Sequence, residues 1–125
     1  MKILNIAALV VGAALMATPA LADPEVRAGE YTAKGTNFDG SSYSGTAHIA
    51  ITSNSTCSIT WKTGSATSST SEGICMRDAD SLAAAYKMGD AVGLIIYKIN
   101  DDGSLDGFWT IAGQSGAGTE TLTPQ

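Results

Sequence analysis

The chain has 125 residues, of which 44% are hydrophobic and 15% charged, and its formal net charge is −5. This length suits a single domain. The acidic balance argues against nucleic-acid binding and against attachment to anionic membranes, because both need a basic patch.

The first 22 residues have the three-part layout of a secretory signal peptide. Lys2 precedes an apolar run from Ile3 to Met16, and Ala20 and Ala22 supply the small residues of a cleavage site before Asp23. A retained membrane anchor is the alternative, but a spanning helix needs about 20 apolar residues, more than this run provides. We expect cleavage of residues 1–22, one mature domain at 23–125 with no membrane association, and a periplasmic or secreted location.

After the leader, short β-prone runs are separated by clusters of Gly, Asn, Asp and Ser, which is typical of an all-β domain. Two of the runs alternate apolar and polar residues, as strands with one buried and one wet face do. The apolar run Val92–Tyr97 predicts a strand covered on both faces. Eight strands are expected: Glu30–Gly35, Tyr43–Thr52, Thr56–Thr63, Ser69–Arg77, Ser81–Met88, Val92–Asn100, Ser104–Ala112 and Gly116–Thr123.

The run Ser81–Met88 carries signals for both helix and strand. A possible N-cap at Asp80, three consecutive alanines and a terminal Gly89 favour a helix. Every second residue from Leu82 onward is nevertheless apolar. Eight antiparallel strands can close a barrel, whereas a helix here would leave sheet edges to cover. We therefore predict an antiparallel up-and-down meander of about eight strands, closed or nearly closed into a small barrel.

Turn residues agree with this meander. Asp39-Gly40 and Asp102-Gly103 are typical of two-residue type I′ hairpins. The surrounding segments also resemble each other, which indicates either two four-stranded halves or shared hairpin chemistry.

Two cysteines, Cys57 and Cys75, follow the leader. In an oxidising compartment such a pair indicates one disulfide, and direct pairing would centre the chain reversal near Ala66. A reactive thiol or a metal site would need a nearby histidine or more cysteines, and the sequence has one histidine, His48. We predict a structural bridge and no metal site.

Several of these motifs together resemble a group of short exported bacterial proteins. The shared elements are D-G-x-x-Y-x-G at Asp39–Gly45, a central Trp at Trp61, the D-G-x-L-D-G-x-W-T segment ending at Thr110, and G-x-G-T-E at Gly116–Glu120. The resemblance covers most of the chain after residue 22. It implies a β-barrel-like fold and indicates no particular chemistry.

Polar residues give no clear reactive site. His48 could act as a general base, but it is predicted on the wet face with no carboxylate nearby in sequence, although pairing across strands could supply one. The aspartates at 78, 80, 101, 102 and 106 lack the closing glutamate of a calcium loop, and turn formation explains them.

Aromatic residues are the best candidates for a binding site. If Trp61, Tyr86 and Trp109 point into the barrel, they frame either a small-ligand cup or a packed core, because eight-stranded barrels show both arrangements. The candidate ligand-binding residues are Trp61, Tyr86, Tyr97 and Trp109.

The function expected from the sequence is a non-enzymatic binding module for a small ligand or a protein partner, without a cofactor. The first alternative is a periplasmic barrel resembling protease or lysozyme inhibitors, on architecture alone. The second is a hydrolase that uses an unrecognised pair of carboxylates.

Overall fold

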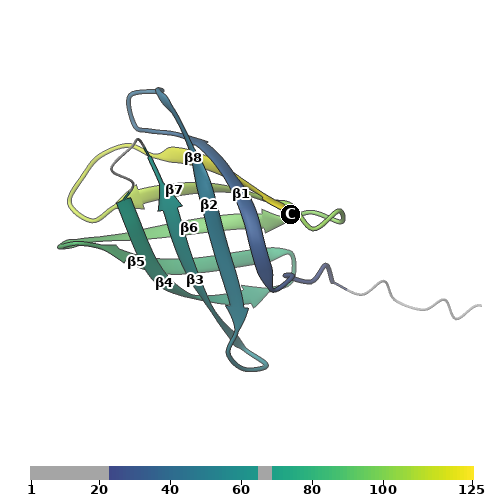
Figure 1. The fold of residues 1–125 in the computed structure, drawn as a ribbon. Helices are drawn as coiled ribbons and strands as arrows, with labels where there is room; N and C mark the ends of the chain where they lie inside the picture. Colours follow the sequence, from purple (N-terminus) through teal and green to yellow (C-terminus); the bar gives the residue numbers. More distant parts are fainter. Residues whose placement is uncertain (1–22, 65–68) are drawn as a thin grey trace, which may run out of the picture.

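The computed structural model describes residues 23–64 and 69–125, so the predicted signal peptide and the reversal near Ala66 lie outside the described residues. Eight antiparallel strands follow one another around a closed barrel (Figure 1). They are β1 Gly29–Thr36, β2 Ser42–Ile51, β3 Thr56–Thr63, β4 Ser69–Asp78, β5 Ser81–Met88, β6 Ala91–Ile99, β7 Leu105–Ile111 and β8 Gly118–Pro124. The described part contains no helix long and apolar enough to cross a membrane.

The predicted meander is confirmed, including the ambiguous run Ser81–Met88, which is strand β5. It pairs with β4 on one side and β6 on the other, and Leu82 and Ala84 are buried inside the barrel. Pairing on both sides satisfies the backbone of β5 and overrides the local helix signals. Closure between β1 and β8 leaves no free sheet edge among the described strands.

The expectation that Val92–Tyr97 is covered on both faces is wrong. Ile95 and Tyr97 point inward and are buried, but Leu94 and Ile96 point outward and are 58% and 61% exposed. A single closed barrel has no second layer, so each strand has one inner and one outer face. Other outward apolar residues lie on β4, which carries Ile74 and Met76, and on β7, which carries Phe108.

The type I′ assignment of the two Asp-Gly turns is also wrong. Only the glycines have positive φ, +87° at Gly40 and +89° at Gly103. In each turn the glycine N–H donates to an asparagine carbonyl three residues earlier, at 2.9 Å. This is the three-residue loop in which a type I turn is followed by a glycine bulge.

The resemblance between the two turns reflects shared hairpin chemistry. One joins β1 to β2 and the other joins β6 to β7, five strands further on, so they do not relate two four-stranded halves. In both, the turn aspartate accepts hydrogen bonds from the backbone and hydroxyl of the following serine, at 2.9 and 2.6 Å.

The predicted disulfide is present. Cys57 on β3 lies directly opposite Cys75 on β4, with 5.0 Å between their Cα atoms. Both cysteines are buried in the interior. The bridge therefore links two neighbouring strands near the β2–β3 end of β3.

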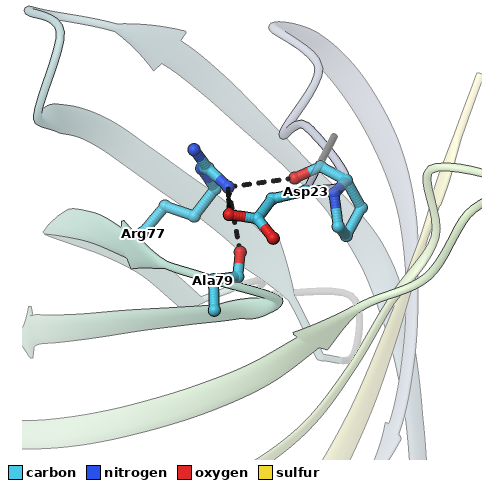
Figure 2. A network of polar contacts seen from close by, with 4 residues as sticks. Asp23, Arg77 and Ala79 are labelled. Carbon is cyan, nitrogen blue, oxygen red and sulfur yellow. Dashed lines mark hydrogen bonds and ion pairs between the residues drawn. The ribbon is translucent and has the colours of Figure 1, made fainter. Parts of the chain in front are cut away.

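One end of the barrel is closed by the segment that precedes β1. Val26 packs against the core, and the Tyr31 hydroxyl donates to the Arg27 carbonyl at 2.6 Å. Figure 2 shows Arg77, whose guanidinium donates to the Ala79 and Pro24 carbonyls at 2.9 and 3.4 Å, beside the Asp23 carboxylate. These contacts hold the segment over the end that carries the β2–β3, β4–β5 and β6–β7 loops.

Candidate ligand-binding site

A cavity of about 230 Å³ lies in the opposite half of the barrel. Its lining comes from the strand ends near the β1–β2, β3–β4 and β5–β6 loops and from the inner faces of β6, β7 and β8. The lining residues are Asn37, Tyr43, Trp61, Thr63, Gly64, Ser69, Ser71, Tyr86, Met88, Ile95, Trp109 and Glu120. This volume is below the roughly 300–1,000 Å³ of common ligand pockets, so the cavity suits a small compound.

Aromatic rings lie over glycines on neighbouring strands, and this arrangement leaves the space open. Tyr43 is paired with Gly35, and Tyr86 with Gly93. A Cβ atom at Gly35 would lie 2.5 Å from the Tyr43 ring, and one at Gly93 would lie 2.2 Å from the Tyr86 ring. Glycine therefore allows each ring to lie against the wall, as in aromatic coverage of strand glycines.

The same arrangement holds a third ring against the wall. Trp109 on β7 is paired with Gly118 on β8, where an added Cβ would lie 2.3 Å from the indole. The indole N–H donates to the Thr119 carbonyl at 3.2 Å, and the Phe38 ring stacks on the indole with centroids 4.9 Å apart. Trp109 is therefore fixed at the mouth of the cavity by contacts from β8 and the β1–β2 loop.

Glu120 on β8 places a buried carboxylate in the lining, with 4% of the residue exposed. Its Oε2 accepts from the Trp61 indole N–H at 3.0 Å and from the Tyr97 hydroxyl. Its Oε1 accepts from the Tyr43 hydroxyl at 2.9 Å. Three donors from β2, β3 and β6 thus converge on one acid across the barrel.

This carboxylate shares its environment with phenols and has no basic neighbour in the described lining. Burial raises the pKa of Glu120, although hydrogen bonds from Tyr97, Tyr43 and Trp61 oppose the shift. Burial and the nearby Glu120 charge also raise the pKa of Tyr86 to about 12 and that of Tyr97 well above its usual value. The tyrosines are therefore neutral hydrogen-bond donors at physiological pH.

Two pairs of rings meet edge to face around the cavity. The Trp61 and Tyr86 centroids are 5.6 Å apart at 64°, and those of Tyr43 and Trp109 are 6.2 Å apart at 71°. The four rings come from β2, β3, β5 and β7, so they surround the cavity.

Three of the four candidate binding residues, Trp61, Tyr86 and Trp109, line this cavity. Tyr97 is fully buried outside the lining, and its hydroxyl contacts two lining residues: it donates to Glu120 and lies 3.1 Å from the Trp61 indole nitrogen. Sequence reasoning missed Tyr43 and Glu120. The signal for Glu120 was a charged residue at an inward position of β8, in phase with Gly118 and Leu122.

The other polar candidates lie elsewhere. His48 is on the outer face, where its Nδ1 lies 2.8 Å from Glu30 Oε1 across the β1–β2 pair, and both side chains are about half exposed. Asp102 accepts a hydrogen bond from Ser104, and Asp106 accepts hydrogen bonds from Asn100 and Thr121. Within the described ranges, no three His, Cys, Asp or Glu residues are grouped as metal ligands.

Comparison with solved structures supports the fold. The chain is similar to the redesigned β-barrel mFAP1 bound to DFHBI, with 20% identity, a TM-score of 0.68, and coverage of 77% of this chain and 93% of that one. It is also similar to the redesigned barrel b11L5F_LGL, with 18% identity, a TM-score of 0.69, and coverage of 82% and 98%. A single-residue mutant of the fluorescent protein UnaG gives 11% identity, a TM-score of 0.52, and coverage of 78% and 95%.

No protein-family model matches the sequence. No curated protein matches it either. The similarities therefore define a class, the small closed antiparallel β-barrels.

Proposed function

We propose that this protein is a non-enzymatic, exported barrel that binds a small ligand in the cavity above Glu120. The observation that carries the proposal is an open cavity of about 230 Å³ whose lining combines aromatic rings with one buried carboxylate. Binding pockets commonly pair apolar walls with a few convergent polar groups. The similar barrel mFAP1, which is bound to DFHBI, supports a small-ligand role for this architecture.

Two features of the chain support the exported location in this proposal. The leader-like residues 1–22 and the Cys57–Cys75 bridge fit a periplasmic or secreted location, because disulfides persist in oxidising compartments. A binder in such a place meets its ligand outside the cytoplasm.

A thermal-shift screen of small compounds tests this function, using protein expressed as the full chain and purified after export. We expect at least one compound to raise the midpoint saturably and to change indole fluorescence. Trp109→Ala should weaken its binding at least tenfold. Because Trp109 is half-buried, its replacement by Ala should lower the free energy of unfolding by less than the about 3–5 kcal/mol expected for a fully buried Trp.

Phe108→Ala is the matched control. Phe108 is the neighbour of Trp109 on β7, points outward and is 68% exposed, so its loss should leave binding unchanged. Equal losses in the two variants, or a screen in which no compound raises the midpoint, would contradict the proposal. Recognition of a protein partner by the loops would then be the better interpretation.

A further inference from the structure

We propose that the ligand carries a protonated amine, which pairs with Glu120 while its apolar body contacts the surrounding rings. This inference rests on the proposed binding function and adds the chemical class of the ligand. It follows from the hydrogen bonds of one carboxylate and from the charges around it.

The first step concerns the acceptor positions of Glu120. An ionised carboxylate has about four lone-pair positions. Trp61 and Tyr97 occupy two on Oε2, and Tyr43 occupies one on Oε1. One position on Oε1 has no donor among the described residues. Glu120 and its Oε1 partner Tyr43 both line the cavity, so a donor on a ligand bound there would lie next to this carboxylate.

The second step concerns charge. Two carboxylates lie within 4 Å of a basic side chain among the described residues, Glu30 beside His48 and Asp23 beside Arg77, and Glu120 is not one of them. No Lys, Arg or His is present in the described cavity lining. A buried carboxylate without a cation is costly, so a ligand cation would stabilise the ionised form of Glu120 by supplying the missing opposite charge. The ionised carboxylate would instead repel an anionic ligand.

The third step concerns the rings. Trp and Tyr faces attract cations through their quadrupoles, and aromatic cages use this attraction to bind ammonium groups. Trp61, Tyr86, Trp109 and Tyr43 surround the cavity that contains the acid. Rings and carboxylate therefore favour the same ligand charge, and the rings also receive an apolar body.

Three compounds with one body and different charges test the proposal: phenethylamine (cation), 2-phenylethanol (neutral) and phenylacetate (anion). Titration calorimetry at neutral pH should show phenethylamine binding at least tenfold more tightly than 2-phenylethanol, with no measurable binding of phenylacetate. Glu120→Gln should reduce phenethylamine affinity at least tenfold and leave 2-phenylethanol within about threefold, a charge-dependent split that a general loss of packing would not produce.

Glu72→Gln is the control for net charge, because Glu72 is an exposed glutamate on the outer face of β4. It should leave both affinities unchanged. If Glu120→Gln fails to fold, the order of the three compounds on the unmodified protein still decides.

Binding of the alcohol or the acid as tight as that of the amine would overturn the inference and leave the binding function standing. So would a library screen whose hits are all neutral or anionic. If neither these compounds nor the library bind, both the inference and the proposed function fail.

Discussion

The two halves of the barrel interior use the same eight strands and differ in how completely side chains fill them. In the half that carries the β2–β3, β4–β5 and β6–β7 loops, here called the closed half, aliphatic residues from facing strands meet in the middle. Its fully buried side chains include Ile49, Ile59, Leu82, Ile99, Leu105 and Leu122. In the half that contains the cavity, here called the open half, the rings of Tyr43, Tyr86 and Trp109 lie against the wall over glycines, and a cavity remains.

This difference shows that a cavity in a small barrel depends on cross-strand neighbours as well as on residue size. Trp61, Tyr86 and Trp109 are larger than the leucines and isoleucines of the closed half. Gly93 allows the Tyr86 ring, and Gly118 allows the Trp109 ring, to lie along the wall instead of across the barrel. The half of the interior with the larger side chains is therefore the half that is less completely filled.

The largest effect is expected in the closed half. Leu122→Ala removes a fully buried side chain, and we expect a loss of about 2–5 kcal/mol in the free energy of unfolding. Urea denaturation measures it. Thr123→Ala, at the next and exposed position, should change stability by less than about 0.5 kcal/mol. Similar losses in both variants would mean that the closed half is not the packed core.

The disulfide should contribute next. Cys57→Ser opens a loop between residues 18 positions apart, and we expect a loss of about 2–4 kcal/mol. Denaturation with and without reductant checks this: reductant should bring the unmodified protein to the stability of the variant and leave the variant unchanged. A variant as stable as the oxidised protein would show that the bridge contributes little.

The two similar turns compare the ends of the barrel directly. Gly40→Ala and Gly103→Ala each place a side chain at positive φ, which costs roughly 1–2 kcal/mol. Gly103→Ala should cost more, because its Cβ would lie 2.7 Å from the Arg27 guanidinium carbon, whereas Gly40 has nothing within 4 Å. Equal losses by urea denaturation would show that Arg27 moves freely away from this turn.

The smallest effect concerns pH in the open half. In the folded state the pKa of Glu120 is raised above its ordinary 4.5. Between pH 4.5 and this raised pKa, Glu120 keeps its proton in the folded state and loses it in the unfolded state. The free energy of unfolding should therefore fall as pH rises through that window and stay lower above it. Glu120→Gln should lack this fall, which denaturation curves from about pH 4 to pH 8 would reveal.

Asp39 and Asp102 provide an internal reference of opposite sign. Hydrogen bonds from Ser41 and Ser104 lower the pKa of these two carboxyl groups below 3.8. Their stabilisation is lost only as pH falls below that value, outside the Glu120 window, and it should persist in Glu120→Gln. Identical pH profiles for the unmodified protein and Glu120→Gln between about pH 4 and pH 8 would contradict a raised pKa at Glu120.

The sequence by itself determined the strands, their meander and the disulfide. The alternation of apolar and polar residues along a strand is a local property with a period of two residues. The inward positions of β2 and β3 could therefore be predicted before any strand pairing was known. Direct pairing of Cys57 with Cys75 also implied the β3–β4 register, which the structure confirms.

Only the tertiary structure decided which inward residues meet. Glu120, Trp61 and Tyr97 lie on β8, β3 and β6, and their contacts run across the interior between strands that are not hydrogen-bonded neighbours. Closure, strand tilt and stagger set such contacts, and no local pattern encodes them. For the same reason, the outward exposure of Leu94 and Ile96 and the cavity itself emerged only once the sheet had closed on itself.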